Sequence, residues 1–580
     1  MRQRTLINLG QHFTLDKNKW PVLCARIESL LSGQSQLIPE QAHPEIEALA
    51  QRYFGRLITA QKPVVRKCTD ETGASSAGAA EYQDVDINSL EMVRPRTIGV
   101  EHVGLAALSL LGLPKILESV GLNAIERNCA LGSIVGRLAA PGSELATWRW
   151  LREKSALGEL LEVDFEGVSH MRLYRVSDLL VRRREEIEQQ LFGRIHELFS
   201  LSTTVTLYDL TNTYFEGELA GNAKARRGRS KEKRSDCPLV TLGLVLDGSG
   251  FIRRSRMFAG NVSEASTLEE MLLLLDTPKE ATVIMDRGIA TEENIAWLVE
   301  HNYRYLVVSR ERVRQFDVTQ AVETTTASDE CIRMQRVVSE DGKEVRLYCH
   351  SEQREEKESA MTKGFMEGFE KKLAALAAGL AKPRCEKRID KLWERIGRLK
   401  EQSHGIGQHY QIALTPDESG KKAVSLTWEK TVIDGTQLTH PGVYCLRTNE
   451  TTWDESTLWH TYTMLTDLEA VFRCLKSELG LRPGFHHTED RAEGHLFITV
   501  LAYQAVQTLR RKLKERGVTA SWSGLREILS VQQRVTASFK QRDGRTLHVR
   551  KATVAEPKLR TIYDALNLSA APGGIKKMAV

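Results

Sequence analysis

The spacing of apolar and polar residues divides the chain into a helical stretch, a mixed stretch and a second helical stretch. Residues 98–200 carry apolar residues at helical spacing, most densely in the leucine-rich segment 105–120. From residue 203 onward, short apolar runs bounded by turn residues indicate strands, with helices between some of them. Strands are predicted at 203–209, 239–247, 251–260, 281–286 and 303–309, and helices at 264–276 and 291–302. This β-β-β-α-β-α-β order requires a mixed sheet flanked by helices, which makes the fold class α/β.

A long interruption follows the last of these strands. Residues 317–350 and 408–446 have the pattern of strands, and residues 352–403 have that of one or two long helices. Two strong helices are then predicted at 454–479 and 491–516. The final segment, AAPGGIKKMAV, has the composition of a disordered tail.

These patterns predict five regions, with a linker at 69–80. The expected regions are a partly helical N-terminal region at 1–90, a helical domain at 91–202, a core formed by 203–310 and 455–516, an insertion at 311–454, and a C-terminal region at 517–580. The helical domain has two open interpretations, packing and recognition of a DNA end, because no helix-turn-helix signature is present.

Composition narrows the class of protein further. A chain of 580 residues exceeds one ordinary core, and its 41% hydrophobic and 27% charged residues are typical of soluble globular proteins. No apolar run approaches the roughly 20 residues that span a bilayer, and the start lacks a signal-peptide pattern. We therefore expect a cytoplasmic protein without a membrane partner. The nine cysteines form no CxxC pair, which argues against a disulfide framework and against structural zinc.

Two acidic residues occupy similar places in the predicted sheet. Asp209 and Asp286 each follow an apolar strand within one compact β/α unit. Side chains at the carboxyl ends of such strands line the ligand crevice. Adjacent carboxylates repel one another unless a cation lies between them, and Mg²⁺ suits such a site. The alternative for either residue alone is a turn former or helix cap.

A third acid belongs to the helix predicted at 454–479. Tyr462, Glu469 and Lys476 are spaced by seven residues, close to two helical turns, so they share one face. Arg473 lies four residues after Glu469 and joins that face. A carboxylate beside a phenol and two cations suits a metal next to a phosphate backbone. A simple surface pair between Glu469 and Arg473 is the alternative.

Several segments together resemble DDE-class insertion-sequence transposases with a Y-x2-R-x3-E-x6-K signature. The segments VTLYDLTNTYFEG, VIMDRGIATEENIAWL and FAGNVSEASTL resemble family segments, and Tyr462, Glu469 and Lys476 match the signature. The resemblance extends from about residue 95 to 510. Leu465 stands where the signature has Arg, so one backbone contact is missing, and Arg473 is our hypothesis for its replacement.

The resemblance implies a ribonuclease H-like core that holds two Mg²⁺ ions, with Mn²⁺ as a substitute. Asp209 is expected to bridge the ions, Asp286 to hold one and Glu469 the other. Water attacks first and frees a 3′ hydroxyl at the element end, and that hydroxyl then attacks target DNA. The partners implied are double-stranded DNA, as terminal inverted repeats and target, and a second copy of the chain in a synaptic homodimer.

Further residues are expected to contact DNA. The loop 217–236 has seven basic residues between 224 and 234, and either grips DNA or is a solvated loop. The expected backbone contacts are Tyr462, Arg473, Lys476, Arg287, Lys231 and Arg234. The basic helix end at 510–516 has the same two interpretations as the loop.

The insertion favours a hairpin step, with Trp428 and Trp453 either stacking on a displaced base or packing in a core. His486 and His487 are interpreted as loop residues near DNA, because hard oxygen ligands suit Mg²⁺ better.

Two rival functions fit the same residues. One is a nuclease with this fold and these metals that performs no joining step. The other is a non-catalytic DNA-binding protein derived from a transposase, although all three acids are present.

Overall fold

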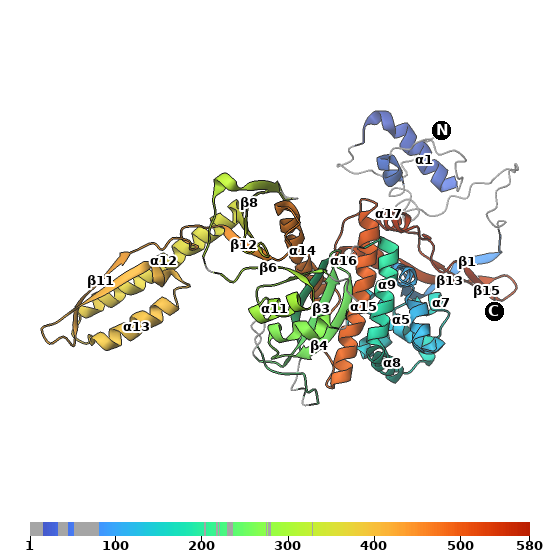
Figure 1. The fold of residues 1–580 in the computed structure, drawn as a ribbon. Helices are drawn as coiled ribbons and strands as arrows, with labels where there is room; N and C mark the ends of the chain where they lie inside the picture. The colour runs from blue at the N-terminus through green and yellow to red at the C-terminus, as the bar shows by residue number, and fades with distance from the viewer. Residues whose placement is uncertain are drawn as a thin grey trace. The chain divides into compact units, whose positions relative to one another are not determined.

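The computed structural model describes residues 15–32, 44–50, 81–201, 205–215, 219, 221–228, 236–273, 275, 280–311, 313–326 and 329–579. The chain forms two compact units (Figure 1). Unit 1 contains Met1–Arg194, Leu219–Asn222 and Arg473–Val580, and unit 2 contains Ile195–Glu218 and Ala223–Phe472. The predicted linker at 69–80 lies outside the described residues.

Unit 2 is built on a nine-stranded mixed sheet in the order β4-β3-β2-β5-β6-β12-β9-β8-β7. Its strands are β2 (Val205–Tyr214), β3 (Leu239–Asp247), β4 (Ile252–Ala259), β5 (Thr282–Met285), β6 (Arg304–Val308), β7 (Val322–Thr325), β8 (Cys331–Val338), β9 (Val345–Ser351) and β12 (Val443–Thr448). β2, β3 and β4 pair antiparallel, whereas β2, β5 and β6 are mutually parallel. The predicted β-β-β-α-β-α-β order is confirmed.

Helices α10 (Leu268–Leu272) and α11 (Glu292–Glu300) cover one face of this sheet. Leu268 and Leu298 pack in one buried cluster with Tyr208 of β2 and Met285 of β5. The helix predicted at 264–276 is shorter than expected, because a 3-10 turn, η3 (Glu264–Thr267), precedes α10. The Thr291 hydroxyl accepts a hydrogen bond from Asn294 N–H and caps α11.

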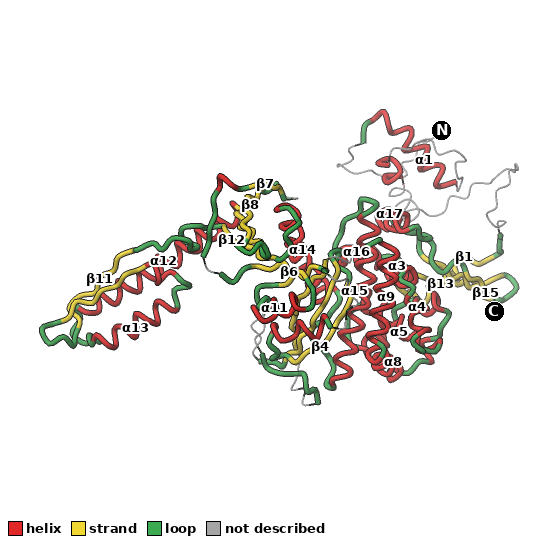
Figure 2. Tube along the Cα trace, in the orientation of Figure 1, coloured by secondary structure: helices red, strands yellow, loops and turns green. Residues whose placement is uncertain are grey.

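The insertion contributes strands to the central sheet as well as a separate helical part. β12 pairs with β6 on one side and β9 on the other, so four insertion strands extend the sheet. Helices α12 (Glu352–Leu380) and α13 (Ile389–Glu401) pack with the hairpin of β10 (Tyr410–Pro416) and β11 (Ala423–Lys430), as Figure 2 shows. The expected mixture of strands and long helices is therefore present.

The helix predicted at 454–479 consists of two parts. α14 runs from Glu455 to Arg473, and a π-helical turn, η6, covers Cys474–Glu478. The Leu479 N–H donates to the Cys474 carbonyl, the five-residue step of a π-helix. The boundary between the two units falls inside α14, after Phe472.

Unit 1 has a helical core, as the pattern at 98–200 predicted. Its helices are α3 (Gly99–Leu110), α4 (Leu113–Ser119), α5 (Ala124–Ala139), α6 (Glu144–Glu153), α7 (Leu157–Leu161), α8 (His170–Arg182), α15 (Glu489–Lys514), α16 (Trp522–Ser530) and α17 (Pro557–Leu566). α9 (Arg184–Phe199) crosses into unit 2. α15 packs against α8, α5 and α3, whereas the sequence pattern had placed residues 491–516 with the catalytic core.

A four-stranded antiparallel sheet completes unit 1, in the order β1-β13-β14-β15. Its strands are β1 (Val85–Thr97), β13 (Gln533–Gln541), β14 (Thr546–Ala552) and β15 (Lys576–Ala579). The prediction of a disordered C-terminal tail is wrong for β15, because its backbone pairs with β14 from Leu547 to Arg550. Near the N-terminus, α1 (Trp20–Ser32) packs with the helical residues 44–50.

No single helix in the described ranges is long and apolar enough to cross a membrane. The bent pair of α3 and α4 passes the length and composition test only when the two are taken together, and they meet at 58°.

Candidate active site

Parallel pairing of β2 and β5 brings the two predicted aspartates side by side. The register joins Thr206 to Val283, Leu207 to Ile284 and Tyr208 to Met285. Asp209 is the next residue of β2 and Asp286 directly follows the end of β5, and neighbouring strands lie about 4.8 Å apart. The two acids predicted from separate segments therefore occupy adjacent positions in the sheet.

Alternation along the strands fixes the face on which these carboxylates lie. Tyr208 and Met285 point into the cluster under α10 and α11. Successive side chains of a strand point to opposite faces, so Asp209 points to the other face, and Asp286 begins the loop directly after β5. One detail of the prediction is wrong: Asp209 does not end its strand, because β2 continues to Tyr214 on the ladder with β3.

The loop that follows Asp286 is held by backbone and arginine contacts. The Arg287 N–H donates to Asp286 Oδ1 at 2.6 Å, and the Asp286 carbonyl accepts from Ile289 and Ala290 N–H. The Arg310 guanidinium donates to the Arg287 carbonyl at 2.8 and 3.0 Å and to the Gly288 carbonyl at 2.9 Å. Asp286 and Arg287 are exposed, so this loop presents a fixed acid and a cation to solvent.

α14 brings Tyr462 to the aspartate face of the sheet. Burial, and after it the negative charge of Asp286, raise the pKa of the Tyr462 phenol to about 12. The ring lies 6.4 Å from that of Tyr444 on β12, whose hydroxyl accepts from the Trp459 indole N–H at 2.7 Å. The phenol is therefore protonated at neutral pH beside an acid, which leaves its O–H as a donor.

Glu469 lies on α14, the helix that carries Tyr462. It belongs to unit 2, as do both aspartates. It follows Tyr462 by seven residues, a rise of about 10 Å along the axis. Its side chain is exposed. The donor atoms of Glu469, Asp209 and Asp286 do not all approach within 4.8 Å of one another. The structure thus brings the two aspartates together, with Glu469 on the helix that faces them.

Arg473 and Lys476 belong to unit 1, beyond the boundary inside α14. The prediction that Lys476 shares a face with Tyr462 and Glu469 assumed an unbroken α-helix. The π-helical turn at Cys474–Glu478 has wider turns and changes the direction of the residues within it. The spacing of seven therefore does not place Lys476 on that face.

The basic loop is described in part. Lys231 and Arg234 lie outside the described residues. Arg226 is held against β3 by two backbone hydrogen bonds with Leu239, at 2.9 and 3.0 Å. The side chains of Arg226 and Arg227 are exposed. This part of the loop has a defined backbone with cations on its surface, as a DNA contact requires.

The tryptophans of the insertion differ in their surroundings. Trp428 packs against the buried clusters between α12, α13 and the β10–β11 hairpin, around Leu380 and Phe369. The side chain is half-buried, and this packing supports the core interpretation. Trp453 is half-buried, and its carbonyl accepts from the Arg336 guanidinium at 2.6 Å.

Sequence analysis missed Glu264, which lies beside the loop after Asp286. A Cβ built on Gly288 would lie 2.6 Å from Glu264 Oε2. Asn294 ties η3 to the same loop by donating to the Ala265 carbonyl at 2.8 Å and to the Ile289 carbonyl at 2.7 Å. The available signal is the resemblance of FAGNVSEASTL to a family segment, in which Glu264 begins the helix predicted at 264–276.

A second acidic cluster lies in unit 1. Glu144, His486 and His495 are the one set of three potential metal ligands in the described residues whose donor atoms converge within 4.8 Å. All three are buried, and His486 forms an ion pair with Glu144. His486 lies in the loop before α15, as predicted, but its side chain is only 7% exposed and faces this cluster. His487 is exposed.

This cluster differs from the oxygen-rich site expected for Mg²⁺. The buried Arg137 guanidinium lies 3.1 Å from His495 Nδ1, and it can only donate. His495 Nδ1 therefore accepts, which places the ring proton on Nε2 and removes that nitrogen as a ligand. A permanent cation beside a single carboxylate also opposes a divalent ion. The cluster is better explained as a buried charge network.

Comparison with protein families gives one result that covers this site. The model of the transposase DDE domain matches residues 201–505, which include Asp209, Asp286, Tyr462 and Glu469. No curated protein matches the chain. The matched segment is more than half of the 580 residues and contains the paired aspartates and the helix opposite them. The chain belongs to the DDE transposase family.

Proposed function

We propose that this protein cuts DNA at the ends of a mobile element and joins those ends to target DNA. The observation that carries the proposal is the adjacency of Asp209 on β2 and Asp286 at the end of β5, with Tyr462 of α14 close to Asp286. The strand order β4-β3-β2-β5-β6, with three antiparallel strands followed by two parallel ones, supports a ribonuclease H-like core. Family membership supports transposition as the reaction.

The acidic residues present fit divalent cations. Asp209 and Asp286 offer hard carboxylate oxygens on adjacent strands, and each engages one oxygen with a backbone N–H. We infer that Asp209, Asp286 and Glu469 would hold two Mg²⁺ ions, or Mn²⁺ in their place. When bound, such ions neutralise charge on the phosphate and lower the pKa of the attacking water. To reach the aspartates, Glu469 would change the conformation of its exposed side chain, or α14 would change its position.

The protein's own groups position the DNA strand at this site. The protonated phenol of Tyr462 donates to a phosphate oxygen beside Asp286. Arg287, exposed on the adjacent loop, provides a second donor. Arg473, Lys476, Lys231 and Arg234 are proposed to hold backbone phosphates further along the strand. These contacts are sequence-independent, so they position the scissile bond without selecting the element end.

The reaction proceeds in two phosphoryl transfers. In the first, water forms a bond to phosphorus and the P–O3′ bond breaks, which leaves a free 3′ hydroxyl at the element end. In the second, that hydroxyl attacks a phosphorus of target DNA and displaces the target's own 3′ oxygen. Each step exchanges one P–O bond for another. The residues of the chain therefore need only orient the DNA strand, donate hydrogen bonds to the phosphate and neutralise its charge.

A cleavage assay tests the proposal. Full-length protein is incubated with Mg²⁺ and duplex DNA carrying the element's terminal repeats, and nicked and joined products are measured separately. Asp286→Asn should abolish nicking while DNA binding is retained. Asp434→Asn is the matched control, because Asp434 is 91% exposed and belongs to the insertion. Parent-like nicking by Asp286→Asn would refute the active site, and nicking without joined product would indicate a nuclease.

A further inference from the structure

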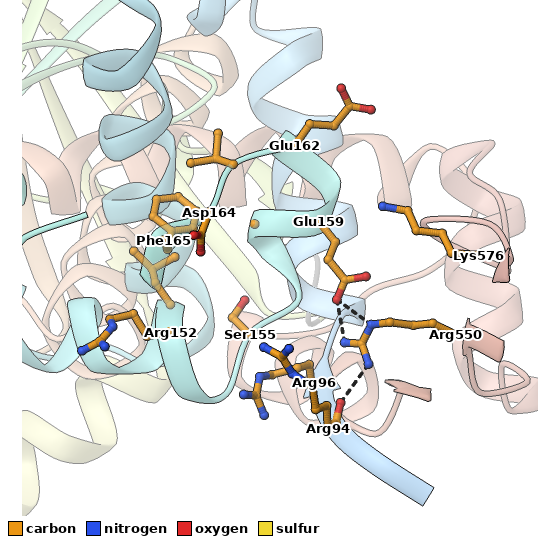
Figure 3. Close-up of a pocket in the computed structure, with 13 residues that line it drawn as sticks. Arg94, Arg96, Arg152, Ser155, Glu159, Glu162, Asp164, Phe165, Arg550 and Lys576 are labelled. Carbon is orange, nitrogen blue, oxygen red and sulfur yellow. Dashed lines mark hydrogen bonds and ion pairs between the residues drawn. The ribbon is translucent and has the colours of Figure 1, made fainter. Parts of the chain in front are cut away.

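Unit 1 contains an open cavity whose walls are rich in arginine. Its volume is about 480 Å³, and β1, the α6–α7 segment, β14 and β15 form its walls (Figure 3). Five basic residues line it: Arg94, Arg96, Arg152, Arg550 and Lys576. We call it the basic cavity. Arg94 and Lys576 are exposed, so solvent and a large ligand can reach it.

Three acids line the same cavity, fewer than the five basic residues. Glu159 accepts from Arg550 at 2.6 and 2.8 Å and from Arg534 at 2.6 Å, so two guanidinium groups share one carboxylate. Glu162 and Asp164 also line the cavity. In Figure 3 the Glu162 carboxylate points away from the side where Arg94, Arg96 and Arg550 gather. The arginine side of the cavity therefore carries an excess of positive charge.

Two of the arginines are held in place before any ligand arrives. Arg550 donates to Glu159, to the Arg94 carbonyl at 3.0 Å and to Thr536 Oγ1 at 2.9 Å. Arg152 lies over the Trp148 ring at 4.3 Å, and its buried Nε has no hydrogen-bond partner among the described residues. Arg550 and Arg152 are therefore fixed parts of the wall, and Arg94, Arg96 and Lys576 beside them are the side chains that can turn to a phosphate.

The surroundings favour a polymer over a small anion. Lys540 of β13 is exposed and lies on the same face of the sheet as Arg550, because Arg550 pairs with Thr536, four residues before Lys540. A series of cations along a sheet follows a phosphodiester backbone, whereas an isolated phosphate needs only a single pocket. According to the proposed function, the polymer that this protein binds is duplex DNA.

We propose that the basic cavity binds the phosphodiester backbone of element-end DNA through Arg94, Arg96 and Lys576. This inference rests on the proposed function and assigns unit 1 a direct part in DNA binding. Each phosphate neutralised releases counterions, so it steepens the salt dependence of binding by about 0.9 in the logarithmic slope.

The test measures binding of terminal-repeat duplex to full-length protein over a range of salt concentrations. The double variant Arg96→Gln with Lys576→Gln should reduce the salt slope by about two. Lys576→Gln alone, at an exposed position, should reduce it by about one. The matched control is Lys558→Gln with Arg560→Gln, which removes two exposed cations from α17 outside the cavity and should leave the slope unchanged.

Equal slopes for the parent and the cavity variants would overturn the inference, and so would equal losses in the cavity and control variants. Inorganic phosphate at matched ionic strength is the second probe. If it binds to the parent but not to the double variant, while DNA binding and its salt slope are the same in both, the cavity takes free phosphate and the DNA assignment is overturned. The cleavage test with Asp286→Asn is independent, so failure of the proposed function and of this inference are distinguishable.

Discussion

At the scale of single residues, the phenol of Tyr462 shows how the sheet and the helix act together. Burial and the charge of Asp286 raise its pKa to about 12, so it remains a donor throughout the range in which DNA is stable. The sequence identified this tyrosine by its spacing to Glu469. Its proximity to Asp286 is a property of the fold, because it depends on a helix that begins about 170 residues after that strand.

Replacing Tyr462 by Phe removes this donor while preserving the ring. We expect strand cleavage to fall roughly 10-fold to 100-fold, as for loss of one hydrogen bond to a charged group. The rate of nicking under single-turnover conditions is the measurement. Tyr82→Phe, at a side chain that is 90% exposed, is the control. Unchanged nicking by Tyr462→Phe would show that the phenol makes no contact with the reacting phosphate.

Arg310 is a positioning residue for the loop that carries Asp286. Its three hydrogen bonds to the Arg287 and Gly288 carbonyls disappear in Arg310→Ala, which should raise the Mg²⁺ concentration required for half-maximal cleavage. Arg310→Lys retains the charge but not the forked geometry, so it should restore only part of the function. A Mg²⁺ requirement equal to the parent's in Arg310→Ala would exclude this role.

At the scale of elements, the buried network of unit 1 links α5, α6 and α15 with the segment before α15. Burial alone would raise the pKa of Glu144, but the hydrogen bond and charge of His486, with the charges of His495 and Arg137, lower it to about 2. Burial and the charge of Arg137 lower the pKa of His495 to about 3. Both groups bind protons more weakly in the folded chain than in the unfolded chain.

Acid should therefore destabilise unit 1 in two ranges. The stability contributed by neutral His495 is complete above its unfolded pKa of 6.5 and decreases as the pH falls toward 3. That contributed by ionised Glu144 is complete above 4.5 and decreases toward pH 2. Urea unfolding measured from pH 7.5 to 4 should show a falling free energy of unfolding, and His495→Gln should flatten it. A pH-independent parent would contradict this.

Secondary structure was predictable wherever apolar spacing was regular. The strands of the central sheet and the helices between 98 and 200 alternate or repeat clearly, and they are confirmed. β1 was missed because its residues are mostly exposed on both faces, so no period of two marks it. β15 was missed because Pro572, Gly573 and Gly574 precede a short run with two lysines, and backbone pairing with β14 orders it.

The candidate site was predictable in its residues more than in its arrangement. Asp209 and Asp286 could be chosen because each follows an apolar run, but their adjacency depends on the order of strands in the sheet. Glu264 could not be chosen, since its place beside Gly288 depends on a loop contact that no spacing encodes. The π-helical turn likewise interrupts the spacing on which the Lys476 prediction depended.

At the scale of the whole molecule, both ends of the chain build unit 1, and the catalytic sheet with its insertion forms unit 2. α15 is buried on nearly all sides among α3, α5 and α8, which is typical of the central helix of a helical core. The spacing of apolar residues in α15 could indicate that it is a core helix, but it could not indicate which helices pack against it. All three proposed metal ligands lie in unit 2, so the proposed metal site requires no ligand from unit 1.

The most direct test of the central claim counts cations bound at the acidic residues. Mn²⁺ is titrated into full-length protein bound to terminal-repeat DNA, and the number of tightly bound ions is measured by isothermal titration calorimetry and electron paramagnetic resonance. We expect two Mn²⁺ per chain in the parent and fewer in Asp209→Asn, Asp286→Asn and Glu469→Gln. A parent stoichiometry unaffected by these substitutions would contradict a shared cation site.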